Sequence, residues 1–262
     1  MRVFITGGTG TIGTPVVAEL LGNGHSVLAL ARSDASTQTL KQAGAEVLRG
    51  GLADLDVLRS GAARSDGVIS LAFGRDYETP EALARSIAEE STAMTVLGNE
   101  LTGSDRPIVA VSGTPWVPGH ISTELDPLPT EGPVGGRVLS QLALLDLASR
   151  GVRSATIRLP RTVHNEGKGG FAGLLTDIAR RTGVSGYPGD GTQRWPAVHA
   201  LDATVIGRRL DLPVQEVPEE DFGPFGPIFA LDQPASSALT RDKFGWTPTH
   251  KSLLEDLENI QP

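Results

Sequence analysis

Short apolar runs alternate with longer stretches of helical periodicity along the first two-thirds of the chain. The apolar runs are rich in β-branched and aliphatic residues without a strict polar alternation, which is typical of strands buried on both faces. They predict strands at residues 2–6, 26–31, 45–49, 67–72, 107–112 and 154–159. Helices are expected between them, at residues 12–23, 35–43, 54–60, 80–101 and 136–149. This alternation predicts an α/β fold built on a doubly wound parallel sheet.

Glycine and proline become frequent after Pro160, most visibly at residues 167–170, 186–191 and 223–227. Because such residues punctuate loops, the regular alternation of strand and helix ends here. We expect residues 1–160 to form one domain and residues 161–262 to form a small C-terminal region interleaved with the sheet edge. That region is either a peripheral segment packed on the sheet or the wall and lid of a substrate pocket.

The composition excludes several classes of site. The 262-residue chain has no cysteine, which excludes disulfides, thiolate zinc sites, iron–sulfur clusters and cysteine nucleophiles. Its five histidines are scattered, and no carboxylates follow a metal-loop spacing, so we expect no metal. A net charge of −8 disfavours nucleic acid, and no window approaches the roughly 18 apolar residues of a membrane span. We expect a cytoplasmic protein with no nucleic-acid and no membrane partner.

A glycine-rich string, Gly8-Thr9-Gly10-Thr11-Ile12-Gly13, follows the first expected strand and opens the first expected helix. This context makes the G-x-G-x-x-G pattern informative. Residues without a Cβ let the backbone turn tightly and approach a pyrophosphate, whose charge is held by free N–H groups and the positive end of the helix dipole. The string predicts a Rossmann-type dinucleotide-binding domain, with these residues at the cofactor: Gly7, Gly10, Thr11, Ile12 and Gly13.

The end of the second expected strand bears on the choice of dinucleotide. An acidic residue there binds the ribose 2′-hydroxyl of NAD, whereas an arginine accommodates the 2′-phosphate of NADP. Here the strand ends without an acid, and Arg32 and Ser33 follow. NADP (NADPH) is therefore favoured over NAD, although Asp34 is close in sequence and Arg32 would also suit a solvated surface.

The string T-G-x-x-G-x-x-G at residues 6–13 resembles that of the extended and atypical short-chain dehydrogenases/reductases, the NAD(P)-dependent epimerase/dehydratase superfamily. Residues 68–72, 109–112 and 157–160 are similar to the family's fourth, fifth and sixth strands. Its two C-terminal landmarks are matched by Val198-His199 with Asp202 and by Phe244-Gly245-Trp246-Thr247-Pro248. The resemblance covers nearly the whole chain and implies an NADP-dependent oxidoreductase with a small-molecule substrate.

The resemblance also implies where a bound dinucleotide would lie. Its pyrophosphate would rest on Gly7, Gly10 and Ile12, and its 2′-phosphate would lie near Arg32 and Ser33. The adenine would lie beside Leu52, the nicotinamide-side sugar against Leu71, Ala72 and Phe73, and the nicotinamide near Pro160 and Thr162. One departure is Gly51, which stands where the family usually has an acidic residue, so an adenine contact is in doubt.

The family's catalytic acid is a tyrosine in a Y-x-x-x-K pair, and this sequence has no such pair. Neither Tyr77 nor Tyr187 has a lysine four residues later. Aligning the family's helix through Gln141 puts Pro133 at the tyrosine position and Arg137 at the lysine position. Arg137 would keep a positive charge and donors for the ribose, although it is not interchangeable with lysine. Pro133 can donate no proton.

Other side chains are candidates for the remaining catalytic roles. Ser112 or Thr114, after the fifth strand, would polarise a substrate carbonyl, unless the two only form a turn. Histidine has the pKa best suited to proton transfer, so His164 ranks first as proton donor and Tyr187 second. Further candidates are His120, Glu124 and ordered water.

Two functional classes stay open at this point. The first is an NADP(H)-dependent oxidoreductase acting on a small organic carbonyl or a conjugated double bond. The second is a non-catalytic NADP-binding sensor or interaction protein that kept the glycine loop and lost the acid. A nucleotide-sugar epimerase or dehydratase comes third, because it too relies on the tyrosine.

The C-terminal third departs from the family in length. Residues 202–204 run almost directly into residues 205–213, where the family usually has a helix, a strand and another helix. Either the substrate region is reduced or part of a longer chain is missing. Residues 80–101 and 136–149 correspond to the family's dimer surface, so a homodimer is the expected assembly.

Overall fold

The computed structural model describes residues 1–74, 79–164, 170–196 and 214–245, together with residues 249, 252, 253 and 255. The chain divides into two compact units. The first comprises residues 1–112 and 130–157, and the second comprises residues 113–129 and 158–262. The second unit thus combines residues 113–129 with the C-terminal part of the chain from residue 158.

A six-stranded parallel sheet carries the fold, in the order β3-β2-β1-β4-β5-β6. This order is that of a Rossmann-type sheet, with the switch in strand order between β1 and β4. The predicted fold class and all six predicted strands are confirmed, with small shifts at their ends. The strands are β1 (Arg2–Thr6), β2 (Ser26–Ala31), β3 (Glu46–Arg49), β4 (Gly67–Ser70), β5 (Pro107–Gly113) and β6 (Arg153–Leu159).

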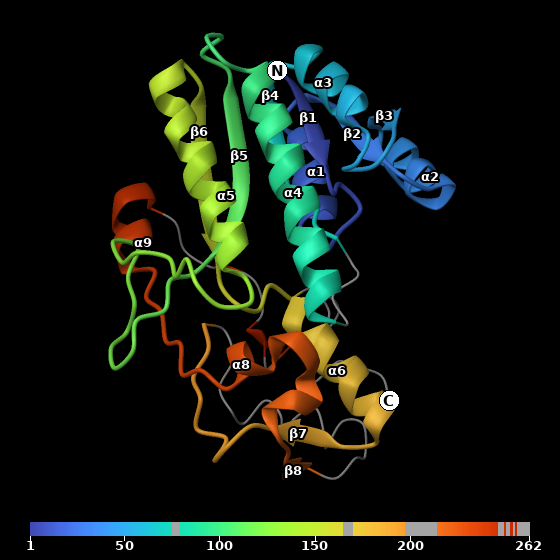
Figure 1. Cartoon of the computed structure of the whole chain (residues 1–262). Helices are drawn as coiled ribbons and strands as arrows, with labels where there is room; N and C mark the ends of the chain where they lie inside the picture. Colours follow the sequence, from blue (N-terminus) through green and yellow to red (C-terminus); the bar gives the residue numbers. More distant parts are fainter. Residues whose placement is uncertain are drawn as a thin grey trace. The chain divides into compact units, whose positions relative to one another are not determined.

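Helices cover both faces of this sheet, because each strand directs alternate apolar side chains to opposite sides. On β1, Phe4 is packed in the core that includes Leu97 and Ile108, whereas Ile5 lies in the core that includes Val17 and Leu40. In Figure 1, α4 and α5 lie side by side in front of the strands. The helices are α1 (Gly13–Gly22), α2 (Asp34–Gln42), α3 (Leu55–Ala63), α4 (Pro80–Glu100) and α5 (Gly135–Asp146), the last followed by a 3-10 turn, η1 (Leu147–Arg150).

The second unit has its own aromatic core, centred on Phe229. This ring is 3% exposed and lies 5.0 to 6.4 Å from four other aromatic rings, those of Phe171, Trp195, Phe222 and Phe225. Trp195, which is half-buried, stacks on the Phe229 ring. The elements of the unit are α6 (Gly170–Thr182), β7 (Ser185–Tyr187), β8 (Val214–Glu216), the 3-10 helix η2 (Glu219–Phe225), α8 (Gly226–Phe229) and α9 (Ala238–Phe244).

The interpretation of residues 223–227 as a loop is wrong, because they lie in η2 and α8. Burial of Phe222, Phe225 and Phe229 on one side outweighs the glycines and prolines of the segment. The helical segment is nevertheless kinked at Gly223, whose φ of 66° lies in the left-handed region. Among the described helices, none is long and apolar enough to cross a membrane.

Replacing Phe229 with alanine tests whether the aromatic rings form the core of the second unit. We expect Phe229→Ala to lower its free energy of unfolding by about 3–5 kcal/mol, the usual cost of deleting a buried ring. The matched control is Phe244→Ala, since Phe244 is 72% exposed and its loss should cost under about 0.5 kcal/mol. Urea denaturation followed by tryptophan fluorescence measures both; equal losses would contradict the assignment.

Candidate functional site

The turn between β1 and α1 is shaped by glycines that stand where no side chain fits. Gly7 has a φ of 74°, and a Cβ on it would lie 2.7 Å from the backbone nitrogen of Ala72. A Cβ on Gly13 would lie 2.0 Å from the carbonyl oxygen of Gly7. By contrast, a Cβ on Gly10 would meet only the Gly7 oxygen, at 3.3 Å. Gly7 and Gly13 are thus required by the protein's own backbone, whereas Gly10 keeps the outer side of the loop clear.

The same turn leaves backbone donors unused at the beginning of α1. Gly10 N–H donates to Gly7 O and Thr14 N–H to Gly10 O, both at 3.0 Å. Within the described part of the chain, the N–H groups of Thr11, Ile12 and Gly13 have no acceptor, and no side chain caps the helix. Unpaired N–H groups and the helix dipole together make an anion-binding position. The loop predicted to hold a pyrophosphate therefore has the donors for one.

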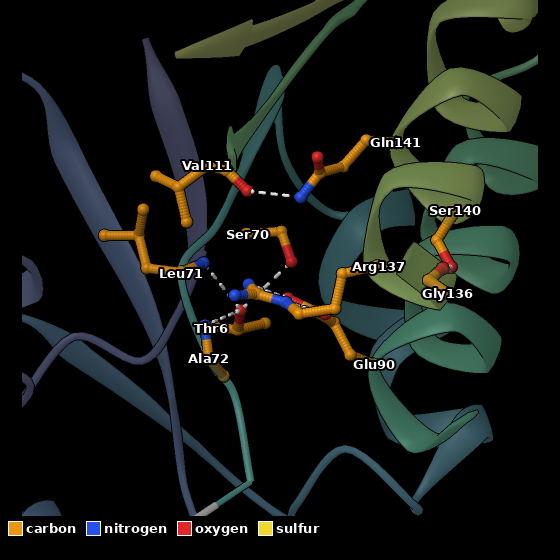
Figure 2. A network of polar contacts seen from close by, with 10 residues as sticks. All are labelled: Thr6, Ser70, Leu71, Ala72, Glu90, Val111, Gly136, Arg137, Ser140 and Gln141. Atoms are coloured by element: carbon orange, nitrogen blue, oxygen red, sulfur yellow. Dashed lines mark hydrogen bonds and ion pairs between the residues drawn. The ribbon is translucent and has the colours of Figure 1, made fainter. Parts of the chain in front are cut away.

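A buried hydroxyl ties this turn to the end of β4 (Figure 2). Thr6 is fully buried, and its Oγ1 accepts the N–H groups of Leu71 and Ala72 at 3.3 and 3.2 Å. Its carbonyl oxygen also accepts the Leu71 N–H, at 3.2 Å. The glycine turn and residues 71–73, which the family resemblance assigned to the pyrophosphate and to the nicotinamide-side sugar of one dinucleotide, are therefore neighbours in the first unit.

At the end of β2, Arg32 and Ser33 differ in how far they are engaged. Ser33 is the N-cap of α2, and its Oγ accepts the Ser36 N–H at 3.2 Å in a capping box. Arg32 is exposed and has no ion-pair partner among the residues described. The neighbouring Asp34 is paired with Arg49 at 3.0 Å, and Arg49 also donates to Thr37 Oγ1. Asp34 is thus paired with Arg49, and Arg32 is left available to an anion.

A side chain further along the chain orders the turn after β3, where Gly51 stands in place of the family's acidic residue. Gly51 N–H donates to Asp54 Oδ2 at 2.7 Å, so a carboxylate three residues later orders this turn. Leu52, predicted to lie beside the adenine, is 9% exposed and belongs to the core between the sheet and α4. Leu52 therefore offers at most the edge of its side chain to a ligand.

The residue at the family's lysine position is held in an ion pair. Arg137, on α5, donates from Nε and Nη2 to the two carboxylate oxygens of Glu90 on α4, at 2.7 and 2.6 Å. The side chain of Glu90 is only 7% exposed and that of Arg137 25%. The guanidinium carbon also lies 4.2 Å from the centre of the Phe73 ring, a cation–π contact. Figure 2 shows Arg137 and Glu90 facing each other beside the ends of β1 and β4.

One turn further along α5, Gln141 fixes the helix to β5. Its amide nitrogen donates to Val111 O at 2.8 Å, and among the described atoms its Oε1 is buried without a donor. Ser112 is 6% exposed near the end of the same strand and has an interaction partner. Pro133, at the family's tyrosine position, is exposed, and Tyr77 lies outside the described residues.

The remaining predicted residues belong to the second unit. Thr114 N–H donates to Leu159 O at 3.0 Å, and Thr162 is 2% exposed. Within the part of the chain that is described, Thr114 Oγ1 and Thr162 Oγ1 are both buried without a hydrogen-bond partner. Between Pro160 and Thr162, Arg161 donates to Gln233 Oε1 at 2.7 Å, an interaction that no local sequence pattern indicates. Two orphaned hydroxyls therefore lie in segments assigned to substrate and nicotinamide.

The candidate proton donors differ in their surroundings. His164 is half-buried and has an interaction partner, and Tyr187 lies in β7 with its ring against Gly191. His120 Nε2 lies 3.5 Å from Asp126 Oδ2. Hydrogen bonds from the Thr240 hydroxyl and N–H, both 2.7 Å from Glu124 Oε1, hold the pKa of Glu124 below its usual value. Glu124 is therefore an ionised acceptor near neutral pH, which does not suit a general acid.

Comparison with known proteins identifies the family. The NmrA-like family model matches residues 1–97. The UDP-glucose 4-epimerase of Thermus thermophilus, solved with NAD, has the same fold, with a TM-score of 0.76 and 16% identity over 98% of this chain and 99% of that one. The fold and the match of the first 97 residues to the NmrA-like model are those expected of an atypical short-chain dehydrogenase/reductase. The resemblance seen in its motifs is confirmed.

The chain belongs to one family with two fungal proteins. It is 35% identical to the uncharacterized protein C2A9.02 of Schizosaccharomyces pombe and 35% identical to the uncharacterized protein YLL056C of Saccharomyces cerevisiae. Each match covers 98% of this chain and 98% of the relative. The first alignment is 294 positions long, whereas 98% of 262 residues is about 257, so about 37 positions have no counterpart in this chain. Over the aligned length, this chain is therefore shorter than its fungal relative from Schizosaccharomyces pombe.

No group of three or more histidine, aspartate or glutamate side chains among the described residues could hold a metal ion.

Removing one partner of the Glu90–Arg137 pair should be costly. We expect Arg137→Met to lower the free energy of unfolding by about 3 kcal/mol, because it leaves a buried carboxylate unpaired. The double variant Glu90→Leu/Arg137→Met should recover most of this loss, since an apolar pair of similar volume avoids the desolvation penalty. Chemical denaturation of the two single variants and the double variant measures the coupling; additive losses would show that the two charges act independently.

The Glu124 carboxylate predicts a pH-dependent contribution to stability. A lowered folded-state pKa stabilises the fold above the unfolded-state pKa, and the contribution is lost as the pH falls through the folded-state value. Thr240→Val should raise the pKa of Glu124 and reduce stability at pH 6, and this loss of stability should become smaller as the pH falls to 3. NMR titration and denaturation at both pH values measure this. Thr39→Val, whose hydroxyl donates only to Ala35 O, is the control; a deficit of equal size at both pH values would refute the assignment.

Proposed function

We propose that the protein binds NADP(H) and transfers a hydride between it and a small organic carbonyl or conjugated double bond. The observation that carries the proposal is the set of unpaired N–H groups of Thr11, Ile12 and Gly13 at the beginning of α1. These groups would hold the pyrophosphate, and Gly10 presents no side chain that would take its place. The nicotinamide, when bound, would supply or accept the hydride.

The choice of NADP rests on the charges at the end of β2. Arg32 would bind the 2′-phosphate together with the N-terminus of α2 at Ser33, where backbone N–H groups and the helix dipole favour an anion. Asp34, the acid that would instead favour NAD, is paired with Arg49 and so repels a phosphate less. The orphaned buried hydroxyl of Thr162 supports a polar ligand at the segment that the family assigns to the nicotinamide.

For catalysis we propose that Ser112 or Thr114 polarises the substrate oxygen and that His164 or Tyr187 supplies the proton. Arg137 would then support the nicotinamide-side ribose. The second candidate function is a non-catalytic NADP sensor. It is favoured by the Glu90–Arg137 pair, because this pair compensates the positive charge that would help a catalytic acid lose its proton.

Ligand titration tests the cofactor. We expect NADPH to bind more tightly than NADH, and Arg32→Gln to weaken NADPH binding roughly 10- to 100-fold, the loss of a charge-assisted hydrogen bond worth about 1.5–3 kcal/mol. NADH binding should be unchanged by this substitution. Arg59→Gln, which removes an exposed arginine paired with Asp56 on α3, is the control. Equal affinity for the two dinucleotides, or no binding of either, would overturn the proposed specificity.

Isotope transfer separates the enzyme from the sensor. Stereospecifically deuterated NADPH is incubated with ketones, aldehydes and enones, and the products are analysed by mass spectrometry. We expect deuterium in the product from one face of the nicotinamide only. Tight NADPH binding with no transfer to any of these substrates would favour the sensor.

A further inference from the structure

We propose that Glu90 is a positioning residue of the cofactor site, which acts by holding Arg137 over Phe73 so that the guanidinium can bind the nicotinamide-side ribose. The inference rests on the proposed binding of NADP(H). It concerns a carboxylate that belongs to no sequence motif and that is too deeply buried to reach a ligand itself.

The geometry of the pair fixes which donors remain. Arginine carries five N–H donors in a rigid plane. The bonds to Glu90 use the edge formed by Nε and Nη2. In the described structure Arg137 makes no other side-chain hydrogen bond, so Nη1 and the second hydrogen of Nη2 stay unused on the opposite edge. Glu90 therefore determines the direction in which Arg137 presents its remaining donors.

The Phe73 ring fixes the plane of the guanidinium. Its centre lies 4.2 Å from the guanidinium carbon. Phe73 follows Leu71 and Ala72, whose N–H groups are held by Thr6 Oγ1 directly before the glycine turn. Glu90, Arg137 and Phe73 thus lie together at the end of β4 in the first unit. The nicotinamide half of a dinucleotide bound to this glycine turn is expected at the same place.

Both contacts explain why arginine stands at the lysine position. A lysine ammonium can approach one carboxylate, but it cannot form a bidentate bond, lie flat on an aromatic ring and still offer a second edge to a ligand. Because Glu90 neutralises Arg137, the site would bind the ribose through directed hydrogen bonds rather than through net positive charge.

Two ligands separate this positioning role from a structural one. NADPH spans the whole site, whereas adenosine 2′,5′-bisphosphate lacks the nicotinamide and its ribose. We expect Glu90→Gln to weaken NADPH binding roughly tenfold, the loss of about one hydrogen bond to a charged group, and to change the Kd of adenosine 2′,5′-bisphosphate less than about twofold. Isothermal titration calorimetry measures both, and Glu89→Gln removes the same charge one residue earlier on α4 as the control.

A second variant keeps the test decisive if Glu90→Gln does not fold. Glu90→Asp keeps the buried charge but withdraws the carboxylate by one methylene from Nε and Nη2 of Arg137, and it should produce the same selective loss of NADPH affinity. Equal weakening of both ligands, or no change in either, would overturn the positioning role while leaving the proposed function intact. Failure of the unsubstituted protein to bind either ligand would overturn the proposed function and the inference with it.

Discussion

The close approach of the β1–α1 turn to the end of β4 is the constraint on which the first unit depends. Thr6 is the last residue of β1, and both its hydroxyl and its carbonyl oxygen accept N–H groups from residues 71–72. Gly7 follows at once, and any Cβ there would collide with the backbone of Ala72. A small polar residue followed by glycine is therefore a packing requirement, which β1 and β4 would impose even without a ligand.

This constraint has a consequence for how the glycines are interpreted. Gly7 and Gly13 are explained by contacts within the protein, so their presence does not by itself indicate a ligand. The evidence for a ligand comes from two features that these internal contacts do not explain. They are the unpaired N–H groups at the beginning of α1 and the open side of Gly10. Every α-helix leaves its first N–H groups without an acceptor inside the helix, so these donors indicate a ligand only in combination with the glycine turn that precedes them.

The sequence predicted the first unit well because its elements are defined locally. Strands such as β1 and β2 are short apolar runs, and the glycine string marks the turn between β1 and α1. The second unit was harder, because α6 and residues 219–229 become helical through the aromatic rings that they bury together. Glycine and proline are local signals for a loop, and packing between distant residues overrides them.

The residues of the candidate site also fall into two groups, those that the sequence predicts and those that it does not. Gly10, Ile12 and Arg32 follow from motif and position, whereas Glu90 could not be found from the sequence. It lies 47 residues before Arg137, and nothing in a helical pattern distinguishes a buried carboxylate with a distant partner from a solvated one. From the sequence, Arg137 was interpreted as a cation that binds the ribose, and Pro133 as a residue that cannot replace the catalytic tyrosine. This interpretation is incomplete, because it leaves out the Glu90 carboxylate that faces Arg137.

The neutral pair also bears on which of the proposed substrates suits the protein. Reduction of a ketone leaves a strongly basic alkoxide, so a nearby acid must give up its proton as the hydride arrives. A free lysine beside a phenol assists this by lowering the pKa of the phenol, but Arg137 is already compensated by Glu90. Addition of hydride to a conjugated double bond leaves a delocalised enolate, which is far less basic and can take its proton later from water. Of the two proposed substrate classes, a conjugated double bond therefore depends less on a proton donor among the residues of this chain.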